Sequence, residues 1–312
     1  MCRFRFLVTI IILSTYICIL SAWGISNEHY IPEIVIRAPW GKAPKGFGLI
    51  EEAEGVGPQS LCIDADLNIY VVDLVNRCVQ KFDSAGHYIS KIDFDIRAHD
   101  VTVDDTGNVY VLAPYDNIIK KYDVKGDWLT TYRIAKKIEQ IDALIVRNAD
   151  VVVRTAKQDE YLIATGKGTL NSRDQLNTVK KGISGMNGNL RYETFWINDH
   201  TGKFLVLDDK GEKLKEVLVS TKNSLGSIVF INSDRKGQLY LLLTTFDKDG
   251  YAQLKVLKYN QKGELMAAIK LPSRYFTYCY KKVVVDRYGN VYQLLTTEDG
   301  VTVIKWHIVN EK

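Results

Sequence analysis

Apolar residues in this chain come in short runs separated by polar positions, Gly, Asn and Asp. Residues 57–86 contain three such runs, and residues 87–93 add a fourth. Alternating or short clustered apolar positions are typical of β-strands, and closely spaced turn residues favour hairpins between them. The separators recur roughly every eight to ten positions, at Asp66, Asn68, Asn76 and Gly86. This stretch therefore predicts a small antiparallel sheet of four strands.

Two turn patterns of this sheet recur along the chain. The turn between the first two runs reads Asp…Asn-x-Tyr at residues 64–70, 104–110 and 286–292, and more loosely at 235–240. The turn before the fourth run ends on a glycine, at Gly86, Gly126, Gly168, Gly211 and Gly263. Glycine suits such turns because it adopts a positive φ without steric cost. The glycines lie about 40 to 50 residues apart, which is the length of a four-stranded propeller blade.

The last copy of the repeat lacks an outer strand of its own. Residues 301–310 have the pattern of a third strand, and no turn glycine follows them. A blade without its fourth strand would expose an unpaired edge, which the lone strand-like run at residues 33–38 could cover. We therefore predict an all-β, six-bladed β-propeller of four-stranded antiparallel blades, closed by an N-terminal strand that completes the last blade. The alternative is that residues 33–38 form an unstructured arm.

Residues 57–86 and 100–126 resemble the NHL repeat of six-bladed β-propellers. They carry its Asp…Gly-Asn-Val-Tyr-Val and Asn-Arg-x-x-x-Phe-Asp patterns, and the glycine-rich residues 40–48 are similar to the linker that precedes such repeats. The second copy departs from the pattern, with Asn117-Ile118 in place of Asn-Arg. The resemblance implies the propeller fold, but propellers serve unrelated functions, so it implies no particular activity.

The composition fits one folded domain that does not bind nucleic acid. A chain of 312 residues could hold two average domains, but all-β rings of this size form one, and 46% hydrophobic residues suffice for a core. The formal net charge is +4, to which Arg3 and Arg5 of the N-terminal segment contribute two. The remaining cations are spread along the sequence, without a basic run interleaved with aromatic residues. We expect no DNA or RNA partner, no cofactor and a monomeric protein.

Residues 1–24 have the pattern of a signal peptide or N-terminal anchor. Two arginines precede the apolar residues 6–20, and small residues follow. Cleavage after Ala22 or Gly24 would leave residues 25–312 as a single propeller domain. The apolar run could instead remain as a membrane anchor, since it is only slightly shorter than a spanning helix. In either case we expect export, to a secreted, periplasmic or cell-envelope location, with membrane contact only through an uncleaved leader.

Three cysteines lie outside this segment: Cys62, Cys78 and Cys279. Cys62 falls on a predicted first strand and Cys78 on the third strand of the same blade. Two strand spacings separate them by about 9.6 Å, which is too far for a disulfide. We expect buried free thiols that pack as small hydrophobic side chains.

Ligands of propellers commonly lie over the central channel, on the face built by the entries to the first strands and the loops between second and third strands. That geometry selects seven candidate ligand-binding residues: Gln59, Arg77, His99, Asp100, Tyr115, Tyr278 and Tyr280. His99 beside Asp100 could be a metal ligand, a general base or a hydrogen-bonding residue of the channel face. Arg77 could instead tie blades together. The tyrosines could stack on a sugar or peptide, or fill space between sheets.

No catalytic or metal-binding residue is assigned. In gluconolactonase-like propellers, the first metal ligand is the Glu of a Glu-Gly-Pro motif, and this motif is interrupted here at residues 54–58. Peptide-amidating lyases need a histidine-rich zinc centre, and His99 is the only histidine here in a suitable position for one. We therefore expect an exported, non-catalytic module that binds a protein, peptide or glycan on the channel face. The alternative is a metal-dependent hydrolase or lyase at the channel, which requires two more ligands near His99 and Asp100. The candidates for these are Gln59, Gln140, Glu193 and Asp247.

Overall fold

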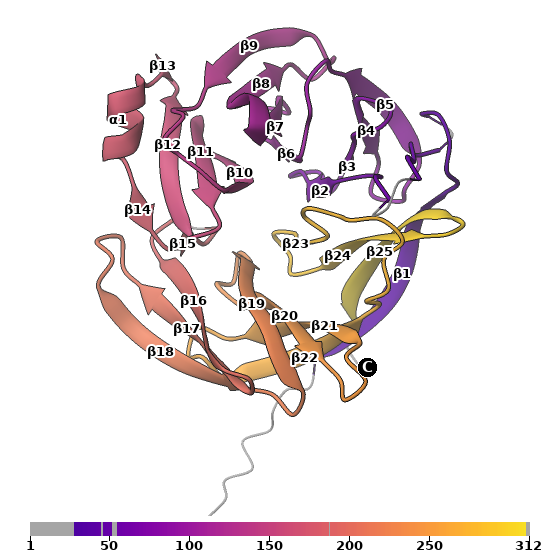
Figure 1. Cartoon of the computed structure of the whole chain (residues 1–312). Helices are drawn as coiled ribbons and strands as arrows, with labels where there is room; N and C mark the ends of the chain where they lie inside the picture. Colours follow the sequence, from indigo (N-terminus) through magenta and orange to yellow (C-terminus); the bar gives the residue numbers. More distant parts are fainter. Residues whose placement is uncertain (1–27, 45, 52–54, 187, 310–312) are drawn as a thin grey trace, which may run out of the picture.

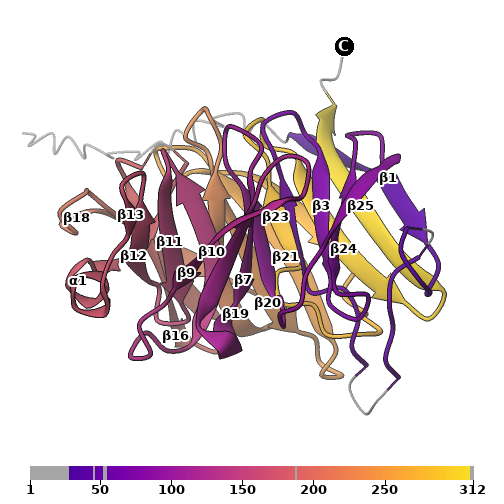
Figure 2. The same cartoon turned by 90° about the horizontal axis from the view of Figure 1, so that it is seen from above.

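The computed structural model describes residues 28–309 except 45, 52–54 and 187, so the predicted leader lies outside the described residues. Six antiparallel sheets form a ring around a central channel (Figures 1 and 2). The predicted six-bladed β-propeller is confirmed. Within the described ranges, no helix has the length and apolar character needed to cross a bilayer.

Blades one and two have the layout that the repeat predicts, with the first strand beside the channel and the fourth at the rim (Figure 1). Blade one comprises β2 (Ser60–Ile63), β3 (Ile69–Asp73), β4 (Cys78–Phe82) and β5 (Tyr88–Asp93). Blade two comprises β6 (Asp100–Val103), β7 (Val109–Ala113), β8 (Ile118–Tyr122) and β9 (Trp128–Arg133). A 3-10 turn, η1 (Pro114–Asp116), connects β7 to β8. Strands β3 and β7 are buried along their whole length, which explains their continuous apolar runs.

Blades five and six follow the same order. Blade five comprises β19 (Ser224–Ser233), β20 (Leu239–Phe246), β21 (Ala252–Tyr259) and β22 (Leu265–Leu271). Blade six comprises β23 (Val283–Val285), β24 (Val291–Thr297), β25 (Gly300–Val309) and β1 (His29–Ala38). β1 pairs antiparallel with β25, from His29 opposite Val309 to Ala38 opposite Val301. The N-terminal strand therefore completes the last blade as predicted, and the alternative prediction of an unstructured arm is wrong.

Blades three and four depart from the repeat. Blade three has β10 (Ile141–Arg147), β11 (Asp150–Thr155) and β12 (Asp159–Thr165), but its rim is divided among β13 (Gly168–Thr169), helix α1 (Ser172–Asn177) and β14 (Lys180–Lys181). Blade four has an inner strand of only two residues, β15 (Ile183–Ser184), followed by β16 (Arg191–Asn198), β17 (Thr201–Leu207) and β18 (Lys213–Ser220).

Helix α1 is held by side-chain hydrogen bonds. Asn171 caps it by accepting a hydrogen bond from the Asp174 amide. The buried Gln175 side chain accepts from the Ala135 amide at 2.8 Å and donates to the Arg133 carbonyl at 2.9 Å. The helix is thereby fixed to the connection between blades two and three, at the rim of the ring.

The recurrent aspartates organise the turns between first and second strands. Asp104 Oδ1 accepts from the amides of Thr106 at 3.0 Å and Asn108 at 2.9 Å. Its Oδ2 accepts from the Asn108 side chain at 2.9 Å and from the Tyr110 hydroxyl at 3.0 Å. Asp64 makes the equivalent bonds in blade one. The Asp…Asn-x-Tyr pattern is therefore the hydrogen-bonding set of this turn in blades one and two.

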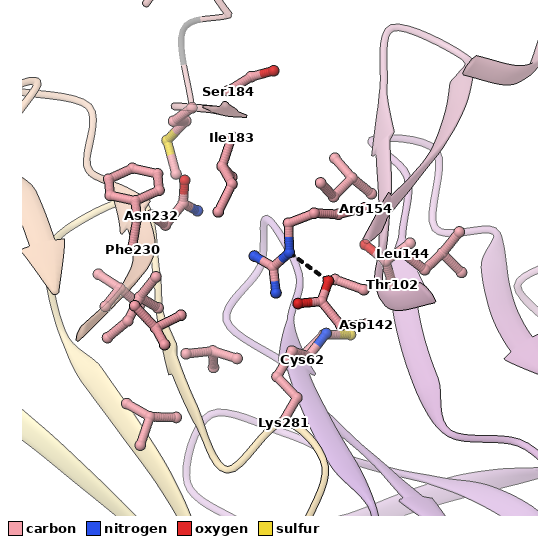
Figure 3. A pocket seen from close by; sticks show the side chains of 18 of the residues that line it. Cys62, Thr102, Asp142, Leu144, Arg154, Ile183, Ser184, Phe230, Asn232 and Lys281 are labelled. Atoms are coloured by element: carbon pink, nitrogen blue, oxygen red, sulfur yellow. Dashed lines mark hydrogen bonds and ion pairs between the residues drawn. The ribbon is translucent and has the colours of Figure 1, made fainter. Parts of the chain in front are cut away.

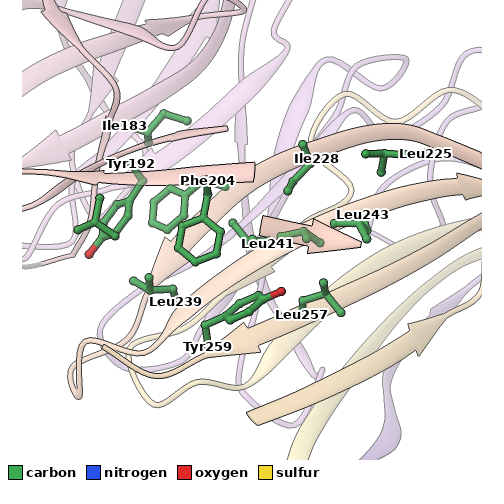
Figure 4. Packing of buried hydrophobic residues seen from close by; sticks show 13 residues of the cluster. Ile183, Tyr192, Phe204, Leu225, Ile228, Leu239, Leu241, Leu243, Leu257 and Tyr259 are labelled. Atoms are coloured by element: carbon green, nitrogen blue, oxygen red, sulfur yellow. The ribbon is translucent and has the colours of Figure 1, made fainter. Parts of the chain in front are cut away.

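The core lies between blades rather than within them. Five apolar clusters join blade six to one, one to two, two to three, four to five, and five to six. Figure 4 shows the cluster between blades four and five, with Phe204 of blade four beside Tyr259 of blade five. These two rings meet edge-to-face with centroids 5.1 Å apart. None of these five clusters of described residues joins blades three and four. The three described cysteines, Cys62, Cys78 and Cys279, are free and buried as predicted, with Cys62 and Cys279 in two of the clusters.

Candidate ligand site over the central channel

The first strands of the blades enclose a channel with a volume of about 890 Å³. We call the face with the strand entries and the loops between second and third strands the entry face, and the other the opposite face. Figure 3 shows the Arg154 guanidinium extending into the channel, where it donates from Nε to Asp142 Oδ1 at 2.6 Å. Ile183, Phe230 and Asn232 lie across the cavity from this pair. The volume suits a small ligand or one projecting group of a larger ligand.

Three of the predicted residues form an aromatic cluster on the entry face, which we call the His99 cluster: His99, Tyr115 and Tyr280. The His99 ring lies edge-to-face between the other two, with centroids 5.0 Å from Tyr115 and 5.3 Å from Tyr280. The His99 amide donates to the Leu112 carbonyl at 2.8 Å, which fixes the residue just before β6. Tyr115 projects from η1 and is 73% exposed.

The surroundings of His99 keep its imidazole neutral near pH 7. Burial lowers the pKa of His99 below the ordinary 6.5, since desolvation and the nearby Arg97 outweigh the attraction of Asp100 and Asp116. Within the described residues its Nδ1 has no hydrogen-bond partner. This nitrogen is buried, so the surface that the cluster offers to a ligand is chiefly the exposed Tyr115 ring.

Asp100 is fully buried and serves the scaffold. Its Oδ1 pairs with the Lys281 ammonium and accepts from the Val101 amide at 2.8 Å, while Oδ2 accepts from the Leu144 amide at 2.9 Å. Both carboxylate oxygens are therefore engaged away from His99. The carboxylate ties blade two to blade three and to the entry of blade six.

Tyr280 and Lys281 reach across the ring, a contact that the sequence pattern did not indicate. The Tyr280 hydroxyl donates to the Ile141 carbonyl of blade three, and Lys281 Nζ donates to the Val101 carbonyl of blade two at 3.2 Å. Both residues line the channel. Such contacts between distant segments leave no local signal in sequence. Tyr280 therefore has a structural role in addition to its ring contact with His99.

The remaining candidates take different positions. Tyr278 is 58% exposed and lines the channel beside Tyr280. Gln59 is buried, and its side chain donates to the Gly57 carbonyl at 2.8 Å. Arg77 is an exposed turn residue with φ 53°, outside the channel lining, and its carbonyl accepts from the Phe94 amide at 2.9 Å. The structure thus gathers Tyr278 with the His99 cluster, and it separates Arg77 from them.

The metal-enzyme alternative needs two further ligands beside His99 and Asp100. In the described part of the chain, no three His, Cys, Asp or Glu side chains are grouped closely enough to hold a metal ion. Asp100, the partner expected for His99, is already bound to Lys281 and to two backbone amides. The His99 cluster is consequently an aromatic surface with one neutral imidazole, and it can stack on and hydrogen-bond to a ligand.

Comparison with known proteins supports the architecture only. No protein-family model matches the chain, and no curated protein sequence matches it. Among solved structures, a member of the DUF4221 family from Bacteroides vulgatus aligns with a TM-score of 0.52 and 11% identity, over 92% of this chain and 100% of that one. A calcium-binding regucalcin from Agrobacterium tumefaciens aligns with a TM-score of 0.50 and 11% identity, over 89% and 94%. At these identities the likeness shows the propeller fold that this chain shares with them.

Proposed function

We propose that this protein is an exported, non-catalytic binding module whose ligand, a peptide or protein segment or a glycan, lies on the entry face of the propeller. The observation that carries the proposal is the His99 cluster, whose Tyr280 also lines the channel of about 890 Å³. Tyrosine rings combine an apolar face with a polar hydroxyl, which suits stacking on sugars and on peptide side chains.

Further exposed aromatic residues belong to the same face. Tyr251 lies in the loop between β20 and β21 and is 62% exposed, and Trp196 lies near the end of β16 and is 54% exposed. The β16–β17 and β20–β21 hairpins each join a second strand to a third, so their loops share the entry face with Tyr115 and Tyr278. Large exposed apolar side chains gathered on one face are typical of interaction sites.

Replacing Tyr115 or Tyr278 by alanine should weaken ligand binding about tenfold, which corresponds to the loss of about 1.4 kcal/mol of stacking and contact energy. The measurement is calorimetric titration of the purified protein with panels of oligosaccharides and peptides. Trp128→Ala is the matched control, because Trp128 is 61% exposed but lies on the rim strand β9. We expect Trp128→Ala to bind like the unmodified protein.

Equal affinity in all variants, or an equal loss in Trp128→Ala, would overturn the assignment of the site. The metal-enzyme alternative makes a different prediction for the same proteins. Stoichiometric zinc or calcium in protein purified without a histidine tag, lost in His99→Ala, would favour a hydrolase or lyase over a binding module.

Export and membership of the NHL-repeat family are parts of the same proposal. The apolar residues 6–20 behind two arginines support export, and the repeated Asp-centred turns support a divergent NHL repeat. Expressed with its leader, the protein should be recovered from outside the cytoplasm with a mature N-terminus at about Trp23 or Ile25. Intact-mass spectrometry decides this, since a chain starting at Met1 in the cytoplasmic fraction would contradict export.

A further inference from the structure

The channel concentrates positive charge that is dispersed in the sequence. Six cationic side chains line it, accompanied by only two carboxylates, Asp105 and Asp142. The cations are Arg147, Arg154, Arg235, Lys281, Lys282 and Arg287. They come from blades three, five and six, and more than one hundred residues separate the first from the last. A cleft lined by one sign of charge focuses the field and attracts ligands of the opposite sign.

Three of these cations have a carboxylate partner, and one of the three pairs is long and exposed. Arg154 pairs with Asp142, and Lys281 pairs with the buried Asp100. Arg287 Nη2 lies 3.9 Å from Asp105 Oδ1, a long contact to a side chain that is 84% exposed. No ion pair among the described residues involves Arg147, Arg235 or Lys282. The channel therefore retains an excess of unpaired positive charge.

Three of the arginines lie at the opposite face, where the first strands end. Arg147 is the last residue of β10, and Arg235 and Arg287 each follow the aspartate of a turn after β19 or β23. The Arg235 amide donates to the Arg287 carbonyl at 3.1 Å, which places the blade-five and blade-six turns side by side. Arg147 uses Nη2 to donate to the Ser184 carbonyl at 2.8 Å, which leaves its other N–H groups for a ligand.

We propose that the end of the channel at the opposite face is a binding site for a small anion with at least two negatively charged oxygen groups, held by Arg147 and Arg287, with Arg235 at its edge. The planar fork of a guanidinium matches carboxylate and phosphate oxygens, and both chemistries fit this site. The site does not depend on the His99 cluster, which belongs to the entry face, and it goes beyond the binding function proposed above.

The test uses pyrophosphate and citrate as probes, with the neutral sugar glucose as the uncharged comparison. Calorimetric titration at low salt should show binding of at least one anion, and binding should weaken as sodium chloride is raised. Arg147→Gln and Arg287→Gln should each weaken it at least about tenfold, the loss expected for one charge-assisted hydrogen-bonded pair. Arg173→Gln, on the exposed rim helix α1, removes the same charge from the molecule and should leave the affinity unchanged.

The outcomes separate this site from the entry face. Binding of citrate alone or pyrophosphate alone supports the proposal and identifies the anion class. Tyr115→Ala should bind the anion normally, so a failure of the entry-face proposal leaves this one intact. Absence of binding to both anions, or an equal loss in Arg173→Gln, overturns it. Thermal unfolding of each variant without ligand checks that Arg147→Gln, which loses its bond to Ser184, remains folded.

Discussion

Gly86→Ala should lower the free energy of unfolding of the propeller by about 2 kcal/mol or more beyond the decrease caused by Gly211→Ala. Both glycines occupy the same position in the turn before a fourth strand, with φ of +85° and +86°. A Cβ at Gly211 would meet no atom within 4 Å, so this substitution measures backbone strain alone, about 1–2 kcal/mol. A Cβ at Gly86 would lie 1.6 Å from the Val35 carbonyl oxygen of β1, and a backbone atom cannot rotate away.

The clash falls on the contact that closes the ring, because Gly86 belongs to blade one and Val35 to the last strand of blade six. Urea unfolding of the two variants measures the difference in unfolding free energy. Limited proteolysis adds a local test, since displacement of β1 should speed cleavage within His29–Ala38 in Gly86→Ala but not in Gly211→Ala. Equal destabilisation of the two variants would show that the contact between blades one and six contributes little to closure.

Those parts of the fold that local chemistry determines could be predicted from the sequence. The Asp-centred turns follow from local hydrogen bonding, and the glycines of the turns before the fourth strands follow from the need for a positive φ. The role of the lone strand before blade one follows from the unpaired edge that it covers. Blade three was harder, because α1 holds its place through Gln175, whose partners Arg133 and Ala135 lie in another connection. β15 has only two residues, too few to show a periodicity that the sequence alone could reveal.

The site was predictable only in part for the same reason. Strand entries pointed to His99, Tyr278 and Tyr280, and a loop between second and third strands pointed to Tyr115, which requires only the repeat geometry. The hydrogen bond from Tyr280 to Ile141 depends on which segments meet across the ring. The same is true of the arginines that lie together at the opposite face. Charge that is spread along the sequence becomes concentrated because strands, turns and connections of three blades meet at one channel.

The contact between blades three and four is polar, and its disruption should be the second large effect. Arg191 Nη2 lies 3.1 Å from Glu160 Oε2, and the two side chains are only 6% and 5% exposed. Glu160 Oε1 also accepts from the Ser184 amide at 2.9 Å, and Arg191 Nε donates to the Lys181 carbonyl at 2.6 Å. Arg191→Met would leave the Glu160 carboxylate buried without its counter-charge. We expect a loss of about 3–5 kcal/mol in unfolding free energy.

A second substitution distinguishes the cost of an uncompensated charge from a simple loss of packing. Adding Glu160→Gln to Arg191→Met removes the buried negative charge while retaining an acceptor for the Ser184 amide, so the double variant should be more stable than Arg191→Met alone. Lys91→Met is the control, since it breaks the Lys91–Asp93 pair, whose side chains are 38% and 66% exposed, and should change stability by no more than about 1 kcal/mol. A double variant less stable than Arg191→Met would mean that packing, and not charge compensation, holds this interface.

The same interface lacks an apolar cluster among the described residues, so the polar network there takes the role that hydrophobic contacts have between the other blades.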